Sequence, residues 1–409
     1  MSGHLRLVVT NAMLDGEAVS LTALDGVITA IGPDAGGNSP ATADSSLESL
    51  DAGGGILCPP LINGHTHAAM TLFRGHGDDL PLMRWLQEAI WPVEAKLEPE
   101  DVYWGTRLAC LEMIRSGTIG FWDMYWQPAS TARAVEDAGL RAVIGPPLFD
   151  APDKTFEERN RELEGWLDEL AGFGDRIAAA VAPHAIYTVG TASLEYAVGL
   201  AADRDLPVHI HLSETEGEVN DCVEAHGMRP AAYLDSLGML TPTTTLAHGV
   251  WLDREEIELI ADRGATVTSN PVANMKLAVG GVFPYPEAAR AGVPVALGTD
   301  GAGSNNSLDL LVRCGLKYSR GKDQLLCYGE NMPLDVLLVR DDDIPDLVQE
   351  DVCDVGIVGL NVVEEKRIGF MARGVRPLFE QVTTLDYGRC RLSLAVPDGK
   401  PYDGPLSLG

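Results

Sequence analysis

Between about residues 55 and 300, short apolar segments alternate with longer amphipathic ones. The apolar segments have the length and the branched side chains typical of buried strands. The longer segments place apolar residues at helical spacing. The predicted strands are 55–61, 118–124, 142–148, 177–182, 207–212, 243–248, 265–269 and 293–298, and the predicted helices include 99–116, 130–138, 156–171, 193–203 and 254–262.

Eight strands alternating with helices favour an α/β fold, a parallel (β/α)8 barrel of the TIM type over residues 55–308. An open doubly wound sheet would carry a glycine-rich nucleotide loop after its first strand, and none is present in the sequence. Residues 1–54 differ from the barrel. They predict a small β-subdomain with short strands separated by Gly, Asp and Pro, at 5–10, 18–24 and 26–32, and a loop at 35–48.

The chain has 409 residues and a formal net charge of −30, which argues against nucleic acid as a partner because its phosphates would be repelled. The carboxylates are spread along a sequence with 45% hydrophobic residues. This distribution favours a folded protein with an acidic surface, as in the acidic proteomes of salt-adapted organisms, over a disordered acidic tail.

The sequence gives no sign of a membrane or of an oxidising compartment. It contains no run of about 18 apolar residues, and its first residues lack the layout of a secretory signal. Seven cysteines without metal-type pair spacing fit a reducing environment. We therefore expect a cytoplasmic protein without a membrane partner, and a homo-oligomer is compatible with the sequence.

Histidines and carboxylates gather where the predicted barrel strands end. In a barrel of this type the active site lies at the C-terminal ends of the strands, so side chains from distant segments meet there. A lone buried histidine is more often structural, but a shared position at strand ends favours a site. These residues are His65 and His67 after the first strand, His184 after the fourth, His209 and His211 in the fifth, Glu214 at its end, His248 ending the sixth and Asp300 ending the eighth.

Four of these residues form a candidate metal set, namely His65, His67, His211 and Asp300. Three imidazoles and one carboxylate suit one zinc ion per subunit, with a further position for water, although iron, nickel or manganese accept the same ligands. A zinc ion lowers the pKa of its bound water to about 7. No lysine follows the fourth strand to bridge two metals, so a single metal is favoured.

The remaining residues suggest acid–base chemistry. Glu214, three residues past His211, is expected to take the water proton and pass it to the substrate. His248 is expected to orient the attacking group and to stabilise charge on the attacked carbon. Asp300 is expected to be the third catalytic residue, with Glu214 and His248. His209 is expected to face away from the metal and to pack in the core.

Seven stretches resemble the amidohydrolase superfamily, specifically its 5'-methylthioadenosine/S-adenosylhomocysteine deaminases. The similarity covers about residues 4–308 and implies zinc-dependent hydrolytic deamination at C6 of an adenine nucleoside, which gives the inosine analogue and ammonia. The matching stretches are 64–75, 91–94, 182–184, 209–215, 246–249, 269–277 and 297–306.

The resemblance also implies substrate contacts. Glu94 would hold the ribose hydroxyls and His184 would contact the nucleoside, although a surface carboxylate and a turn-stabilising histidine are the alternatives. Ser304 either touches the substrate or caps the next helix. Some family members bind a substrate carboxylate with arginines after the third strand. Residues 145–150 contain none, which favours 5'-methylthioadenosine, 5'-deoxyadenosine or adenosine over S-adenosylhomocysteine.

After residue 308 the motifs resemble another family, ATP phosphoribosyltransferase. Residues 309–409 are similar to its N-terminal domain, which implies a partial α/β fragment of the periplasmic-binding-protein type. The family's first strand and phosphoribosyl-pyrophosphate loop are absent, so an inactive transferase is expected. The matching stretches are 311–316, 330–345, 354–365 and 388–395.

Both resemblances break off inside a domain, whereas natural boundaries lie in linkers, so a chimera is the favoured explanation and an inactive chimera stays an alternative. The junction lies in a helix-like stretch, 305–315, which is expected to replace the eighth barrel helix. The run Asp341-Asp342-Asp343 is at least as well explained by an acidic helix N-terminus as by a magnesium site.

Overall fold

The computed structural model describes residues 4–35, 45–77 and 80–310, together with a few short pieces beyond. By contacts, the chain divides into two compact units, Met1–Arg313 and Cys314–Gly409. In the second unit three short strands form antiparallel pairs in the order β15-β16-β17: β15 (Tyr318–Ser319), β16 (Leu326–Gly329) and β17 (Val336–Leu337). The expected α/β fragment and the Asp341-Asp342-Asp343 run otherwise lie outside the described residues.

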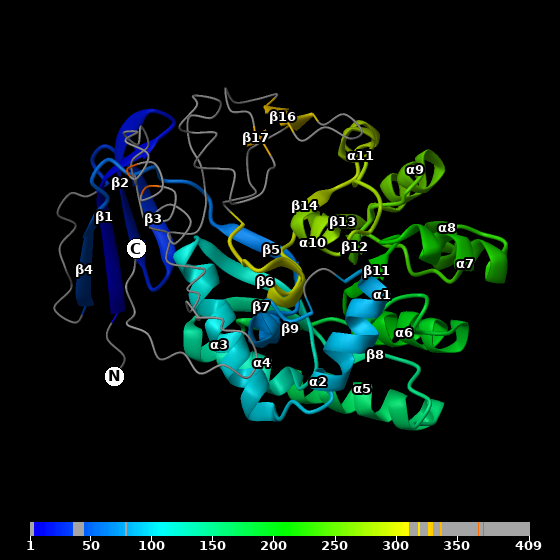
Figure 1. Cartoon of the computed structure of the whole chain (residues 1–409). Coiled ribbons are helices and arrows are strands. Elements are labelled where there is room, and N and C mark those ends of the chain that lie inside the picture. Colours follow the sequence, from blue (N-terminus) through cyan, green and yellow to red (C-terminus); the bar gives the residue numbers. More distant parts are fainter. Residues whose placement is uncertain are drawn as a thin grey trace, which may run out of the picture. The chain divides into compact units, whose positions relative to one another are not determined.

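A four-stranded sheet forms the first part of the chain, as expected (Figure 1). Its strands are β1 (His4–Leu14), β2 (Glu17–Leu24), β3 (Val27–Gly32) and β4 (Ser45–Asp51) in the order β3-β2-β1-β4. The prediction of a loop at 35–48 was wrong from Ser45 onward, because β4 pairs in parallel with β1. A serine-rich segment has weak strand propensity of its own, and the neighbouring strand supplies the hydrogen bonds.

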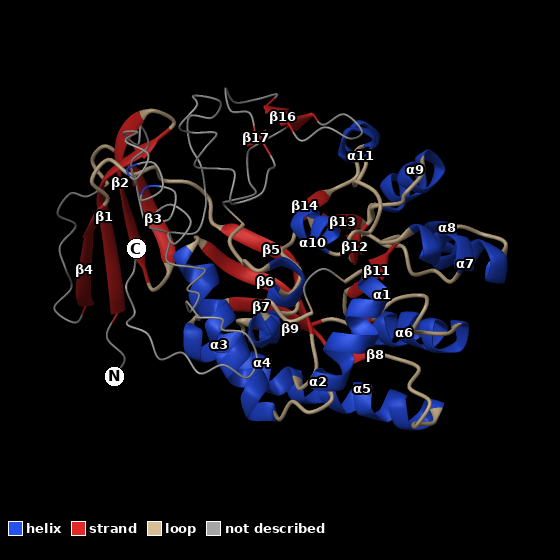
Figure 2. Cartoon of the chain, in the orientation of Figure 1, coloured by secondary structure: helices blue, strands red, loops and turns tan. Residues whose placement is uncertain are grey.

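The eight predicted parallel strands of the α/β barrel are confirmed, with helices outside them (Figure 2). Its strands are β5 (Leu61–Thr66), β6 (Thr118–Met124), β7 (Arg141–Gly145) with β8 (Pro147–Leu148), β9 (Ile177–Ala179) with β10 (Ala182–Pro183), β11 (Val208–Leu212), β12 (Thr244–His248), β13 (Thr266–Ser269) and β14 (Val295–Leu297). Bridges from Val181 to Val208 and from Ala185 to His211 join the fourth strand to the fifth. The ring closes where the N–H groups of Thr299 and Asp300 donate to the His65 carbonyl.

The five predicted helices are confirmed within a few residues as α3 (Pro99–Arg115), α4 (Pro128–Ala138), α5 (Phe156–Leu170), α6 (Thr191–Arg204) and α9 (Arg254–Arg263). A helical insertion follows the first strand and comprises η1 (Ala68–Phe73), α1 (Leu82–Arg84), the π-helix η2 (Trp85–Ile90) and α2 (Trp91–Glu94). The other helices are α7 (Glu216–His226), α8 (Pro230–Ser236), α10 (Pro271–Lys276), α11 (Tyr285–Ala291) and α12 (Ala302–Asn305).

Two further predictions need correction. The first barrel strand begins at Leu61 and not at residue 55, because Pro59 and Pro60 lack the N–H groups that a sheet ladder requires. His65 therefore lies inside the strand. The helix expected at 305–315 fails in its described part, since α12 ends at Asn305 and Asn306 takes a left-handed conformation, φ 68°.

Apolar side chains fill the space between strands and helices. Phe121, Ile144 and Ile210 are almost fully buried, and each such side chain stabilises the fold by roughly 1.5–3 kcal/mol. Among the described residues, no helix combines the length and apolar character needed to cross a membrane.

Candidate active site

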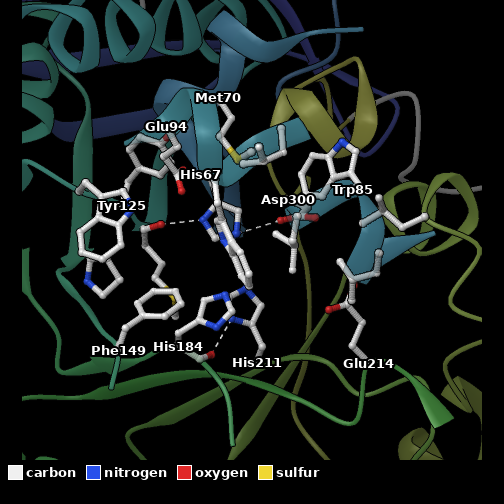
Figure 3. Close-up of a pocket in the computed structure, with 18 of the residues that line it drawn as sticks. His67, Met70, Trp85, Glu94, Tyr125, Phe149, His184, His211, Glu214 and Asp300 are labelled. Atoms are coloured by element: carbon white, nitrogen blue, oxygen red, sulfur yellow. Dashed lines mark hydrogen bonds and ion pairs between the residues drawn. The ribbon is translucent and has the colours of Figure 1, made fainter. Parts of the chain in front are cut away.

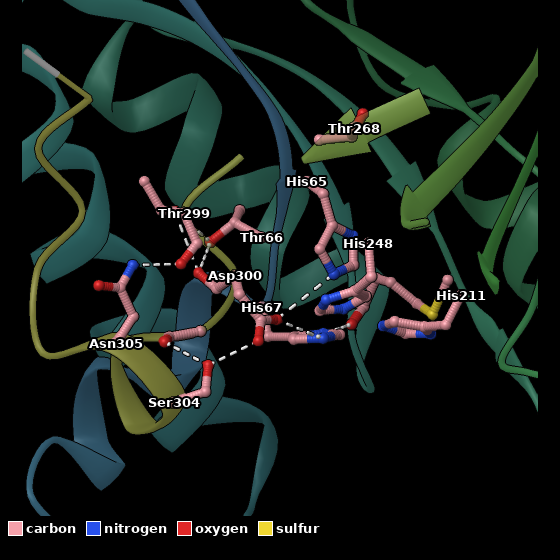
Figure 4. A network of polar contacts seen from close by, with 12 residues as sticks. His65, Thr66, His67, His211, His248, Thr268, Thr299, Asp300, Ser304 and Asn305 are labelled. Carbon is pink, nitrogen blue, oxygen red and sulfur yellow. Dashed lines mark hydrogen bonds and ion pairs between the residues drawn. The ribbon is translucent and has the colours of Figure 1, made fainter. Parts of the chain in front are cut away.

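The first and eighth strands bring two histidines onto one carboxylate (Figure 4). His65 Nε2 and His67 Nε2 lie 3.3 Å and 3.2 Å from the same Asp300 oxygen, Oδ1. The candidate ligand atoms of His65, His67 and His211 lie within 4.8 Å of one another, as do those of His65, His248 and Asp300. The four predicted metal ligands thus meet at the C-terminal ends of the strands.

The other nitrogen of each imidazole is already engaged. His67 Nδ1–H donates to the Met124 carbonyl at 2.6 Å, and His211 Nδ1–H donates to the His184 carbonyl at 2.7 Å. These contacts fix the tautomer, so that Nε2 carries the lone pair that a metal would accept. Two backbone carbonyls therefore orient the rings of His67 and His211.

His209 contradicts one expectation. Its Nε2 lies 2.9 Å from His65 Nδ1, and its side chain is fully buried. It therefore lies on the same side of β11 as His211, because residues two apart in a strand point to the same face. The prediction that His209 faces away from the metal set was wrong, and its contact with His65 Nδ1 orients the ring of His65.

The proposed acid–base pair lies beside the histidines. His248 Nδ1 is 3.6 Å from Glu214 Oε1 and 2.7 Å from Asn274 Oδ1, a partner that the sequence did not suggest. Both residues are almost fully buried. His248 and Asp300 have left-handed backbones, φ 76° and 56°, which are costly for residues other than glycine and cluster at functional sites.

Ser304 orients the carboxylate of Asp300. Its Oγ donates to Asp300 Oδ2 at 2.7 Å and is 2.9 Å from the Gly301 carbonyl. Gly301 is the N-cap of α12, so the capping alternative for Ser304 was wrong. The serine does not line the pocket described below, and it holds the second carboxylate oxygen while Oδ1 faces the histidines.

Burial governs the titration of the site. It raises the pKa of Glu214 and lowers the pKa of His184 to about 3. Burial opposes ionisation of Asp300 as well, but the close contacts with His65 and His67 outweigh it and hold the pKa of Asp300 well below its ordinary value. The site therefore combines one firmly ionised carboxylate with one that titrates at higher pH.

A pocket opens next to these residues (Figure 3). His67, His211 and Asp300 line it, together with Glu214 and His248. The pocket thus joins the candidate metal set to the proposed acid–base pair.

Aromatic side chains build one wall of this pocket. Phe149 stacks on His184 with ring centroids 4.3 Å apart, and Trp126 stacks on Phe149 at 5.4 Å. Flat rings placed in this way suit a planar heterocycle. Trp126 and Phe149 were not predicted from the sequence, although both follow the ends of barrel strands.

Glu94, from the helical insertion, lines the same pocket near Tyr125 and Trp126. Burial raises its pKa, and these two neighbours lower it in part. Glu94 and His184 are therefore both at the cavity, as the resemblance implied. None of the described residues that line the pocket is a lysine or arginine.

The donor set suits a borderline metal ion. His65 Nε2 and Asp300 Oδ1 are buried and have no hydrogen-bond partner among the described residues, yet they point at one another. Three imidazole nitrogens and a carboxylate oxygen are ligands that zinc accepts in catalytic sites. The residues present therefore fit the ion that the sequence predicted.

Comparison with known proteins agrees with this site. The sequence profile of the amidohydrolase family matches residues 56–338. The chain is 51% identical over 263 residues to a 5'-deoxyadenosine deaminase of Methanoregula boonei and 46% identical over 294 residues to a 5-methylthioadenosine/S-adenosylhomocysteine deaminase of Syntrophobacter fumaroxidans. These matches cover 64% and 70% of this chain. It spans 60% and 65% of the length of these relatives.

A solved structure is similar as well, the zinc-bound adenosine deaminase of Xanthomonas campestris. It is 37% identical, with a TM-score of 0.69 over 75% of this chain and 71% of the other.

The profile of ATP phosphoribosyltransferase matches residues 340–408, so the two matches meet beyond residue 308, where the deaminase motifs end. The amidohydrolase profile covers more than half of the chain, and its matched region contains the barrel and the metal set. The chain therefore belongs to the amidohydrolase family.

Proposed function

We propose that this protein is a zinc-dependent aminohydrolase that deaminates an adenine nucleoside to the inosine analogue and ammonia. The observation that carries the proposal is the cluster of His65, His67 and His211, in which His65 and His67 also contact Asp300. Glu214 lines the same aromatic pocket. The deaminase relatives and the zinc-bound adenosine deaminase support the same chemistry.

His65, His67, His211 and Asp300 would hold the zinc ion. When bound, zinc supplies Lewis acidity and makes water a stronger acid at neutral pH. His209 and the carbonyls of Met124 and His184 keep the imidazoles in the required orientation.

Glu214 is the proton carrier. Its buried carboxylate faces the pocket, where it takes one proton of the attacking water and delivers it to N1 of the adenine ring. It then carries the second water proton from the C6 hydroxyl to the departing amino group. Water adds at C6, the C6–N6 bond breaks, and ammonia leaves a C6 carbonyl. His248, fixed by Asn274, stabilises the charge that develops at the reacting centre.

The pocket favours a substrate without charge at its 5' position. The adenine ring would stack on Phe149 and Trp126, and Glu94 would accept hydrogen bonds from the ribose hydroxyls. A neutral 5' group suits the apolar side chains of Leu82 and Leu86. We therefore propose 5'-deoxyadenosine, 5'-methylthioadenosine or adenosine ahead of S-adenosylhomocysteine.

The test is metal analysis of the purified chain, followed by ultraviolet assays with these four nucleosides. We expect bound zinc and deamination of the neutral nucleosides. Glu214→Gln should retain zinc and lose activity by at least about 100-fold, because one positioned general base contributes about 10²–10⁴-fold. Zinc-loaded, folded protein that deaminates none of the four would disprove the proposal.

The match to ATP phosphoribosyltransferase supplies the second candidate. Consumption of ATP with phosphoribosyl pyrophosphate would support it, but the expected absence of a phosphate loop makes this activity the weaker proposal. We also propose that residues 309–409 adopt a partial α/β fold and that the chain is a chimera with boundaries near residues 54 and 308. We further propose that the protein works in the cytoplasm. A homo-oligomer is compatible with the sequence.

A further inference from the structure

A buried glutamate holds the backbone that carries Glu214. One carboxylate oxygen of Glu218 accepts the N–H of Ser213 at 2.8 Å, and the other accepts the N–H of Glu214 at 2.9 Å. Glu218 is 4% exposed and does not line the pocket. It lies in the first turn of α7, directly after the segment that it holds.

This segment needs such support. Ser213 follows β11 in a left-handed conformation, φ 49°, which is unfavourable for a residue with a side chain. The same turn changes the direction of the chain, so that Glu214 faces the pocket. A second tie is the Ser213 carbonyl, which accepts the N–H of Trp251 at 2.9 Å. Without acceptors, the two buried N–H groups of the turn would also be destabilising.

Glu218 is itself held in place. Its own N–H donates to the hydroxyl of Thr215, the N-cap of α7. The carboxylate thus lies at the positive end of a helix, which favours its charge, and burial opposes that charge by raising its pKa to about 8. The hydrogen bonds from Ser213 and Glu214 work against this rise.

From these contacts we infer that Glu218 is a positioning residue for catalysis: its two hydrogen bonds fix the left-handed turn and thereby aim the Glu214 carboxylate at the substrate. The inference rests on the proposed function, in which Glu214 carries the proton. Misplacing a reacting group by about 1 Å costs about 100-fold in rate.

The chain offers a matched control in Glu256. This glutamate is 2% exposed, lies in the first turn of α9, and accepts the N–H of Ala231 at 2.9 Å. It also forms an ion pair with Arg229 at 2.8 Å. Glu256 resembles Glu218 in burial, helix position and backbone contact, but among the described residues it contacts neither Ser213 nor Glu214. Its partner Arg229 donates to the carbonyl of Trp251, so Glu256 reaches the turn only indirectly.

The experiment compares wild type, Glu218→Gln, Glu218→Asp, Glu256→Gln and Glu214→Gln in full-length, zinc-analysed protein. Glutamine at 218 keeps the size of the side chain but can accept only one of the two N–H groups. We expect kcat to fall by about 10- to 100-fold with KM and zinc content unchanged, since Glu218 touches neither pocket nor metal set. Aspartate should restore part of this loss, and Glu256→Gln should change kcat by less than about two-fold.

Amide hydrogen exchange of the peptide that contains residues 212–216 gives a second readout that needs no activity. Exchange should quicken in Glu218→Gln and stay at the wild-type rate in Glu256→Gln. Unchanged exchange in Glu218→Gln, or an equal loss of kcat in Glu218→Gln and Glu256→Gln, would overturn the inference. If wild type itself deaminates nothing, the proposed function fails, and the exchange result alone decides whether Glu218 fixes the turn.

Discussion

At the scale of single residues, the site owes its geometry to contacts that lie behind the reacting atoms. Ser304 holds one oxygen of Asp300, Asn274 faces His248, and His209 faces His65. Each of these partners fixes a side chain whose functional atom points the other way. The proposed chemistry therefore depends on residues that do not line the pocket.

The raised pKa of Glu214 leads to a prediction about pH. The carboxylate must be ionised to take a proton, and burial shifts its pKa upward. As the pH is lowered, kcat/KM should therefore decline with a midpoint above about 4.3, the ordinary pKa of glutamate. A pH–rate profile at constant zinc content measures this limb. An acid limb at or below pH ~4.3 would contradict the assignment.

The sequence predicted the residues that face the metal set because strand ends in a barrel share one rim. It could not predict Asn274 or Glu218, since their partners are fixed only when loops fold against each other. His209 was open to prediction, because a spacing of two residues in a strand already places it on the face of His211. The error lay in the interpretation of a pattern that the sequence contained.

At the scale of elements, the strands approach each other closely under the site. A side chain on Gly298 would lie 2.2 Å from Asn270 Oδ1 and 2.9 Å from the His65 carbonyl. The segment after β14 can therefore pass β5 only with a glycine there. The strands and the longer helices followed from hydrophobic period, whereas the insertion over α1, η2 and α2 did not, because π and short helical turns have no regular pattern.

This close approach predicts that Gly298→Ala lowers zinc content and stability together. Gly165 provides the control, since it lies inside α5 with open space around it. Gly165→Ala should leave activity unchanged and stabilise the protein by about 0.5–1 kcal/mol. Metal analysis and thermal unfolding compare the two variants. A Gly298→Ala protein with full zinc content would show that the strands can separate without loss of the site.

At the scale of the whole molecule, the sequence joins two regions. Residues 56–338 match the amidohydrolase family and contain the whole candidate metal set, and residues 340–408 match ATP phosphoribosyltransferase. Its formal charge of −30 is the other global property. Charges of one sign repel each other in a compact chain, and salt screens this repulsion.

We therefore expect the unfolding temperature to rise between about 0.01 M and about 1 M sodium chloride, as the Debye length shrinks from about 30 Å to about 3 Å. Thermal unfolding followed by circular dichroism measures it, with zinc held constant. Potassium chloride should act alike, because the effect depends on ionic strength. An unfolding temperature that stays level or falls with salt would contradict the inference that repulsion between the acidic side chains limits the stability of the protein.

The left-handed backbones of Ser213, His248 and Asp300 have a consequence for protein engineering. Such conformations store strain of about 1–3 kcal/mol each, and natural proteins retain them where activity requires a particular direction of a side chain. Consensus or computational methods that raise stability would tend to replace these strained residues first, and the gain in stability would come with a loss of the proposed activity. A durable variant should instead be sought in the outer helices, and the rim of the barrel should be left as it is.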